Sequence, residues 1–73
     1  MKLGKFNVEI EYLDEEGNVY DSSDLFFTDD ENEAVKYAKS VELFNPNEQV
    51  SIWEWDDDEQ VVVDSWVVKE YSE

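Results

Sequence analysis

The chain of 73 residues contains no cysteine, no histidine and no arginine. Without cysteine it can form neither a disulfide bond nor a thiolate metal site. Histidine and cysteine are the side chains that most often serve as base and nucleophile near neutral pH, and arginine is the best clamp for a phosphate. The six serines have no recognisable activating partner in the sequence. We therefore expect a protein that is not an enzyme and that carries no cofactor.

Glycine and long apolar runs are also scarce. Gly4 and Gly17 are the only glycines, so the chain has no glycine-rich phosphate-binding loop. No stretch approaches the ~20 apolar residues of a membrane span. Lys2 and Lys5 are not followed by the apolar run of a signal peptide. Together with the lack of cysteine, this composition predicts a cytoplasmic protein without membrane contact.

Positively charged residues are few in this chain. Five lysines face 21 aspartates and glutamates, which gives a formal net charge of −16, yet 41% of the residues are hydrophobic and 15% are aromatic. Disordered acidic segments lack such aromatics, so a folded domain with a strong negative field is indicated. Self-repulsion destabilises a compact state, so we interpret the charge as a surface for a positively charged partner. Nucleic acid and anionic lipid would be repelled, and no direct nucleic-acid binding is expected.

The apolar pattern predicts strands and turns. Residues 6–12 alternate between apolar and polar, as in a half-buried strand, and residues 14–18 have the composition of a hairpin turn. A second strand is expected over 19–27, with a bulge or an edge position because its middle is polar. Further strands are expected over 49–55 and 60–71.

One helix is expected between the two hairpins. Thr28 and Glu31 have the spacing of a capping box, and an apolar stripe then recurs over about four helical turns. The segment Asn45–Pro46–Asn47 should end the helix, because the residue before proline avoids helical backbone angles. We therefore predict an α+β fold: a single small ββαββ domain over residues 1–73, with a four-stranded, mainly antiparallel sheet and one helix packed on one face.

The alternation also predicts which residues share a face of the sheet. The helix-covered face should carry Phe6, Val8, Ile10, Tyr12, Val50, Ile52, Val61, Val63 and Val67. The opposite face should carry Glu9, Glu11, Trp53, Trp55, Val62, Asp64, Trp66 and Glu70. Tryptophans on an uncovered face either pack on one another across strands or form an interface with a partner or a second copy, so a homodimer is one possibility.

The carboxylates form clusters rather than an even coat. The predicted partner-binding residues are Asp14, Glu15, Glu16, Asp21 and Asp24 in and after the first turn, Asp29, Asp30, Glu31 and Glu33 at the helix start, and Trp53, Glu54, Trp55, Asp56, Asp57, Asp58 and Glu59 in the second hairpin. The lysines are too few to neutralise them.

Four explanations of this charge compete. Solubility alone needs far less charge than −16. The run from Asp56 to Glu59 lacks the alternating ligands and central glycine of a calcium-binding EF-hand loop, so no metal site is predicted. Adaptation to a high-salt cytoplasm is disfavoured by the use of lysine alone and by five asparagines. The fourth explanation is imitation of the phosphate backbone of DNA.

Mimicry of DNA is geometrically feasible for carboxylates on strands and turns. Side chains on one face of a strand recur every ~6.8 Å, two residues of ~3.4 Å each. Each strand of duplex DNA carries one charge per ~3.4 Å. A protein that holds DNA through lysine and arginine would therefore meet a folded competitor of similar charge density. Aromatic side chains such as Trp53 and Trp55 could add specific contacts.

By size and charge the chain resembles the small acidic inhibitors that phages and mobile elements make against host defences. These include anti-restriction proteins, anti-CRISPR proteins and inhibitors of uracil-DNA glycosylase, several of which mimic DNA. The resemblance is one of type: a short, cysteine-free, strongly acidic chain with aromatics. It implies an inhibitor of a CRISPR effector, restriction enzyme or other nuclease in the host cytoplasm. An acidic structural or assembly protein that dimerises through its tryptophans is the alternative.

Overall fold

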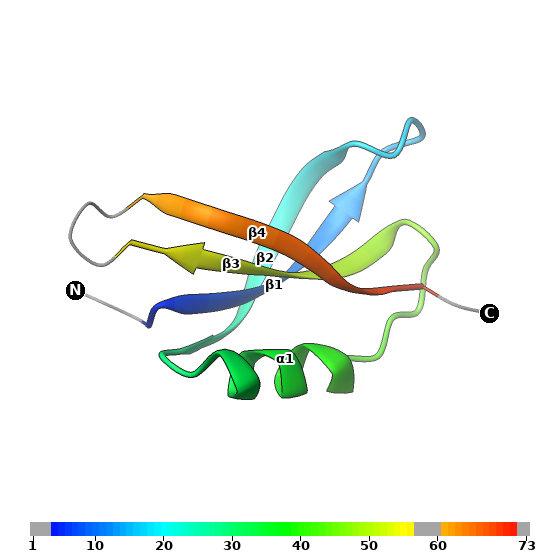
Figure 1. Cartoon of the computed structure of the whole chain (residues 1–73). Coiled ribbons are helices and arrows are strands. Elements are labelled where there is room, and N and C mark those ends of the chain that lie inside the picture. The colour runs from blue at the N-terminus through cyan, green and yellow to red at the C-terminus, as the bar shows by residue number, and fades with distance from the viewer. Residues whose placement is uncertain (1–3, 57–60, 72–73) are drawn as a thin grey trace.

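The computed structural model describes residues 4–56 and 61–71. The elements are β1 (Phe6–Leu13), β2 (Val19–Thr28), α1 (Glu31–Ser40), β3 (Glu48–Trp55) and β4 (Val62–Glu70), as Figure 1 shows. The strands form one sheet in the order β2-β1-β3-β4, with every neighbouring pair antiparallel. One face of this sheet is covered by α1. The predicted ββαββ order and α+β class are thus confirmed.

The two hairpins lie side by side through their first strands. Both β1 and β3 are central, and β2 and β4 form the two edges. The connection through α1 therefore starts at one edge of the sheet and returns the chain to its centre. Two backbone hydrogen bonds extend the β1–β3 pairing beyond the strands, from Leu13 N–H to the Asn47 carbonyl (2.7 Å) and from Trp55 N–H to the Lys5 carbonyl (2.8 Å).

The core lies between α1 and the two central strands. The buried apolar residues are Phe6, Val8, Ala34, Ala38, Val50 and Ile52, and all but Phe6 are 0% exposed. The two alanines occupy the inner side of α1, and their small side chains let the helix backbone approach the sheet. At the margin of this core, Phe26 of β2 stacks on Tyr37 of α1, with ring centroids 4.5 Å apart. The sequence-based assignment of the four strand residues to the covered face is confirmed.

The N-cap of the helix lies two residues later than predicted. Asp30, not Thr28, is the N-cap, and its carboxylate accepts hydrogen bonds from the backbone N–H groups of Asn32 (2.9 Å) and Glu33 (3.4 Å). The Thr28 hydroxyl instead accepts from Asp30 N–H (3.2 Å). Aspartate and threonine both cap helices well, and spacing alone does not rank them.

The helix also ends earlier than predicted, at Ser40 instead of near Asn45. The backbone at Val41 is extended, and both Val41 and Leu43 pack against the core. Two apolar side chains two residues apart can face the same surface only from an extended segment. The ammonium of Lys69 on β4 donates to the carbonyls of Lys39 and Val41, which satisfies acceptors that the helix end leaves open.

The predicted face assignment fails for Trp66 and Asp64 on β4. Trp66 pairs with Ile52 and packs against the core, and Asp64 pairs with Glu54, so both lie on the helix-covered side. The prediction placed both on the opposite face. Valine occurs at both odd and even positions of this strand, so its alternation is ambiguous by one residue.

The prediction also placed three valines on the helix-covered face that the structure shows to be exposed. Val67 pairs with Ser51 on the uncovered face and is 46% exposed, while Val61 and Val63 are 46% and 53% exposed. Two register shifts interrupt the β3–β4 pairing, and they leave Val63 and Val68 without a paired residue. Bulges of this kind change which side chains face the helix, and they are hard to read from alternation alone.

The prediction for β2 is confirmed on both points. This strand lies at an edge of the sheet, and two register shifts interrupt its pairing with β1.

Candidate functional site

Parts of two predicted carboxylate clusters lie at the same end of the molecule, where α1 begins and β3 ends (Figure 1). The backbone of Lys5 joins them. Its N–H donates to Asp29 Oδ1 (2.9 Å), and its carbonyl accepts from Trp55 N–H (2.8 Å). We call this region the acidic end; its described carboxylates are Asp29, Asp30, Glu31, Glu33, Glu54 and Asp56.

The carboxylates at the acidic end differ in the contacts that they make within the chain. Asp30 is engaged as the helix cap, and Glu54 Oε2 lies 3.5 Å from Lys5 Nζ. A surface ion pair of this kind contributes little to stability. Glu31 and Glu33 are exposed on the first turn of α1, where the helix dipole favours negative charge. A partner's cation would therefore meet these two carboxylates with little rearrangement.

The first-turn cluster lies at the other end of the sheet, away from the start of α1 (Figure 1). Asp14 shapes this turn, because its Oδ1 accepts from Glu16 N–H and Asn18 N–H, both at 2.9 Å. Gly17 has φ 86°, which favours glycine at that position. Glu15 and Glu16 are exposed. This cluster is thus separate from the acidic end.

The remaining predicted acidic residues are distributed along the molecule. Asp21 pairs with Tyr12 near the first turn, whereas Asp24 pairs with Glu9 in the middle of the sheet. The predicted contacts Asp57, Asp58 and Glu59 lie outside the described residues.

A row of polar side chains crosses the uncovered face of the sheet, and sequence reasoning did not identify it as a site. We call Asn7, Glu9, Glu11 and Ser51 the polar stripe; they are only 3%, 7%, 6% and 2% exposed. All four lie on β1 and β3, the central strands. The alternation did place the two glutamates on this face, but their burial follows from the central position of β1. Strand order is not contained in the alternation of one strand.

Glu11 is the best-satisfied member of the polar stripe. Its Oε1 accepts from the Gln49 amide (2.8 Å) and from the Ser51 hydroxyl, and its Oε2 accepts from the indole Nε1–H of Trp53 (3.3 Å). Three donors from β3 thus converge on one carboxylate of β1. They also orient Trp53 on this face, as predicted for that residue.

Asn7 links the other two carboxylates of the region. Its amide Nδ2 donates to Glu9 Oε2 (3.1 Å) and to Asp24 Oδ1 (3.0 Å). Its carbonyl oxygen Oδ1 is buried and has no hydrogen-bond partner among the described residues. Buried polar atoms without a hydrogen-bond partner are uncommon in folded proteins.

Burial raises the pKa of Glu9 above the usual glutamate value. The negative charges of Asp24 and Glu11 raise it further, while a hydrogen bond from Ser22 opposes the shift. Removal of the carboxylate from water is therefore the main cause.

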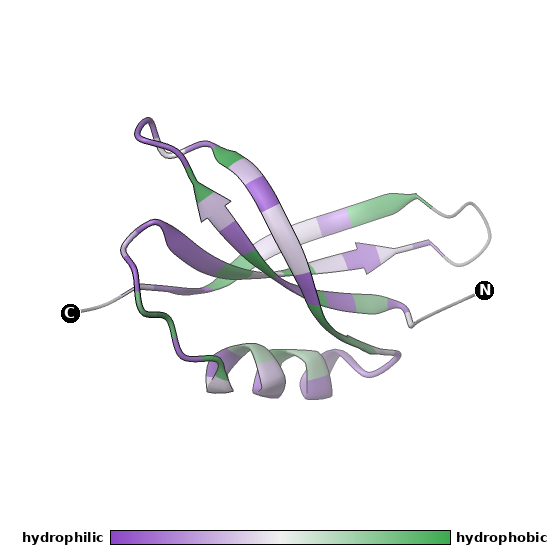
Figure 2. Cartoon of the chain, turned by 180° about the vertical axis from the view of Figure 1, so that it is seen from behind, coloured by the Kyte–Doolittle hydropathy of each residue, from purple (hydrophilic) through white to green (hydrophobic). Residues whose placement is uncertain are grey.

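The tryptophans do not form a common cluster on the uncovered face. Trp53 and Trp55 lie there, two residues apart on β3, but Trp66 packs on the opposite side against the core. Beside them, Val62 and Val67 are 37% and 46% exposed. Figure 2 shows the apolar start of β4 at this edge of the sheet.

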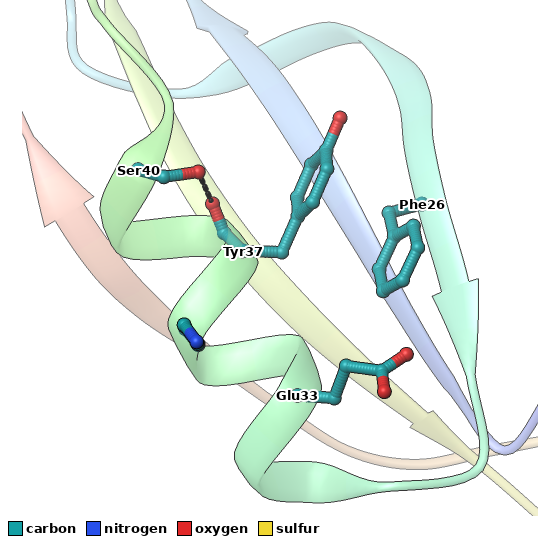
Figure 3. A pocket seen from close by; sticks show the side chains of 5 residues that line it. Phe26, Glu33, Tyr37 and Ser40 are labelled. Carbon is teal, nitrogen blue, oxygen red and sulfur yellow. Dashed lines mark hydrogen bonds between the residues drawn. The ribbon is translucent and has the colours of Figure 1, made fainter.

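On the helix side a small hollow of about 250 Å³ opens between α1 and β2. It is lined by Phe26, Glu33, Lys36, Tyr37 and Ser40 (Figure 3). The stacked aromatic rings form its apolar wall, and the Ser40 hydroxyl is turned to the Tyr37 carbonyl (2.6 Å). The Ser40 hydroxyl is thus engaged at the end of the helix, and the hollow belongs to the margin of the core.

Within residues 4–56 and 61–71, no three acidic side chains converge in a way that could hold a metal ion. The one helix of this part of the chain is too short and polar to cross a membrane. A scan of protein-family models, a search of curated proteins and a search of solved structures each found no match to this chain.

Proposed function

We propose that this protein is a non-catalytic inhibitor that binds a basic nucleic-acid-binding protein, as a DNA mimic of phage or mobile-element origin. The observation that supports this most is the acidic end. There the Lys5 backbone joins Asp29, just before the helix, to the end of β3, which carries Glu54, and Glu31 and Glu33 follow on the first turn of the helix. The proposed site of action is the cytoplasm of the host cell.

The dimensions of the molecule are compatible with mimicry. Its longest extent is 38 Å, close to one turn of duplex DNA at about 34–36 Å. Exposed carboxylates occur at both ends of the sheet, at Glu15 and Glu16 and at the acidic end. A nucleic-acid-binding groove about one turn long would therefore meet negative charge along its length.

The energetics favour a folded competitor over a flexible acidic tail. A backbone that is already ordered in strands and a capped helix loses little freedom on binding, which lowers the entropic cost of association. Pairing of carboxylates with lysine and arginine would replace phosphate contacts of the target. The large net charge would also accelerate association at low salt. CRISPR effectors, restriction enzymes and other nucleases have grooves of the required sign.

The test is a pull-down from bacterial lysate at near-physiological salt, with the tagged protein as bait and duplex DNA added to half of each sample. The expected result is capture of a nucleic-acid enzyme that DNA releases. A bait carrying Glu31→Gln and Glu33→Gln should capture about tenfold less, the factor that corresponds to loss of one hydrogen bond to a charged group. Glu42→Gln with Glu70→Gln removes the same charge at two exposed positions outside the predicted partner-binding residues and is the matched control. Capture that DNA does not release would contradict mimicry.

The alternative function, dimerisation through the uncovered sheet face, is favoured by one observation. Trp53 and Trp55 share this face with the exposed Val62 and Val67. Because Trp66 packs against the core on the other face, the apolar area available for such an interface is smaller than the sequence indicated. Sedimentation velocity at moderate salt distinguishes the two proposals. A stable dimer that captures no partner would favour the structural role.

A further inference from the structure

We infer that Asp21 and Asp64 close the two free edges of the sheet, so that a second copy of this chain cannot pair there by strand addition. Among the described strands, β2 and β4 form the edges (Figure 1). An edge strand presents a row of backbone N–H and carbonyl groups to which another strand can bind. This role of the two aspartates is independent of the proposed inhibitor function.

The backbone groups that face the β4 edge follow from the hydrogen bonding of β3. Trp55 N–H is donated to the Lys5 carbonyl, on the β1 side of β3. Backbone groups of successive strand residues point to opposite sides, so Trp53 also faces β1. Its register partner Ser65 therefore directs its N–H and carbonyl away from β3, to the free edge. By the same alternation Val67 faces this edge as well.

The β2 edge is built in the same way. Leu13 N–H is donated to the Asn47 carbonyl next to β3, so the backbone of Glu11, two residues earlier, also faces β3. Ser22 is the register partner of Glu11 on β2. The N–H and carbonyl of Ser22 therefore point to the free edge, as do those of Asp24.

One outward N–H group is already occupied in each edge strand. Asp64 Oδ1 accepts from Ser65 N–H, and Asp21 Oδ1 accepts from Ser22 N–H, both at 2.8 Å. At both edges an aspartate thus binds the N–H of the serine that follows it. Local side-chain bonds of this kind compete with the hydrogen bonds of a sheet. An incoming strand would have to displace the carboxylate before it could pair.

A single occupied N–H is effective because the regular stretch of each edge is short. Register shifts confine regular pairing to Asp64–Val67 in β4 and to Asp21–Asp24 in β2. Within each stretch only two residues direct their backbone groups outward, and one of them is the serine whose N–H is occupied. An added strand needs outward groups at regular two-residue spacing, so each aspartate removes half of the available positions.

Both edges expose apolar side chains and would otherwise be prone to pairing. On β4, Val62, Val63 and Val67 are 37%, 53% and 46% exposed, and on β2, Val19 and Tyr20 are 48% and 65% exposed. Exposed apolar edge strands favour association between copies. The net charge of −16 also opposes association, but salt screens charge repulsion, whereas a hydrogen-bonded carboxylate stays in place.

The test is sedimentation velocity in about 1 M sodium chloride, where the Debye length is about 3 Å and charge repulsion is screened. The wild-type chain should remain monomeric. The double variant Asp21→Ala, Asp64→Ala should self-associate at least about tenfold more tightly, the factor that corresponds to one hydrogen bond. Asp21→Asn with Asp64→Asn is the matched control. It removes the same charge but keeps a side-chain oxygen that can accept from the serine N–H, so it should remain monomeric.

Hydrogen exchange of the backbone amides gives a second readout that needs no variant. In dilute wild-type protein the Ser22 and Ser65 amides should be protected from exchange although both residues are exposed. In the alanine variant, at dilutions where it is monomeric, both amides should exchange faster. Unprotected Ser22 and Ser65 amides in the wild type would overturn the inference.

The association measurements can also overturn it. An alanine variant that stays monomeric would show that the carboxylates do not guard the edges, and equal association of the alanine and asparagine variants would assign the effect to charge alone. A wild-type dimer in which the Ser22 or Ser65 amide gains protection with concentration would show that the edges are open. A dimer through the uncovered face would leave these amides unchanged. The single variant Asp64→Ala, at an exposed position, repeats the test if the double variant fails to fold.

Discussion

Glu9 combines a central position in the sheet with burial, since the residue is only 7% exposed. Its pKa is raised chiefly by burial and further by the charges of Asp24 and Glu11. A raised pKa means that the folded state binds the proton more tightly than the unfolded chain does. The contribution of Glu9 to the stability of the fold is therefore largest below its pKa in the unfolded chain, near 4.5. This contribution falls as the pH rises from there through the pKa in the folded state.

Glu9→Gln is therefore expected to raise the melting temperature at pH 7, because the buried charge is removed while a hydrogen-bonding group is kept. Below the unfolded pKa of glutamate the gain should disappear, since wild-type Glu9 is then protonated as well. Thermal unfolding followed by circular dichroism between pH 4 and pH 7, as an approximate working range, measures the difference. A variant less stable than wild type at pH 7 would show that the carboxylate is net stabilising.

Glu11 should respond in the opposite way to truncation. Glu11→Ala leaves the donors of Gln49, Ser51 and Trp53 without their common acceptor. Ser51 is buried, whereas Gln49 and Trp53 are half-buried; because an unsatisfied buried group costs about 1–3 kcal/mol, a loss of about 2 kcal/mol in the free energy of unfolding is expected. Urea denaturation measures it, with Glu15→Ala in the exposed turn as the control. A loss below about 0.5 kcal/mol, typical of surface changes, would contradict the role of this network.

At the scale of elements, α1 depends on its ends more than on its length. Ten residues form a marginal helix in isolation. The Asp30 cap at one end and the Lys69 ammonium at the other satisfy backbone groups that the helix leaves open. The buried Ala34 and Ala38 then dock this helix on the sheet. The same cap positions the carboxylates of the acidic end.

Asp30→Ala is expected to lower the free energy of unfolding by about 1 kcal/mol, the usual cost of removing an N-cap. Asp30→Asn should keep most of this stability, because the amide oxygen can still accept from the backbone of Asn32 and Glu33. Chemical denaturation of the three proteins tests the prediction. Equal stability of the alanine and wild-type proteins would move the cap to Thr28.

At the scale of the whole molecule, the net charge of −16 opposes a fold whose core contains only six buried apolar residues among those described. Like charges at both ends repel one another over distances comparable with the Debye length at low salt, about 30 Å at 0.01 M. The proposed binding surface and the self-repulsion that opposes folding thus have the same origin.

The melting temperature should accordingly rise between about 0.01 M and 0.15 M sodium chloride, because the Debye length falls to about 8 Å. Mild acidification should act in the same direction, since it protonates carboxylates that repel one another. Differential scanning calorimetry gives both dependences. A melting temperature insensitive to salt would indicate that bound cations already neutralise the carboxylates.

The element order and the central core could be predicted from local patterns. Residues such as Phe6, Val8, Val50 and Ile52 alternate with polar neighbours in strands that have no register shift between them, so their face was readable. In β4, by contrast, two register shifts and valines at both parities concealed the position of Trp66. The helix end was misjudged because Val41 fits an apolar stripe at helical spacing and also an extended segment with Leu43.

The amino-acid sequence by itself determined the charge, the absence of histidine, cysteine and arginine, the ββαββ order and the position of the first turn, because these depend on composition and on neighbours along the chain. Only the tertiary structure decided which carboxylates are buried and which lie at the same end of the molecule. Strand order placed β1 in the centre and buried Glu9 and Glu11, and the Lys5 backbone joined the helix start to the end of β3. Contacts between residues distant in sequence follow from how the hairpins pack, which no local periodicity encodes.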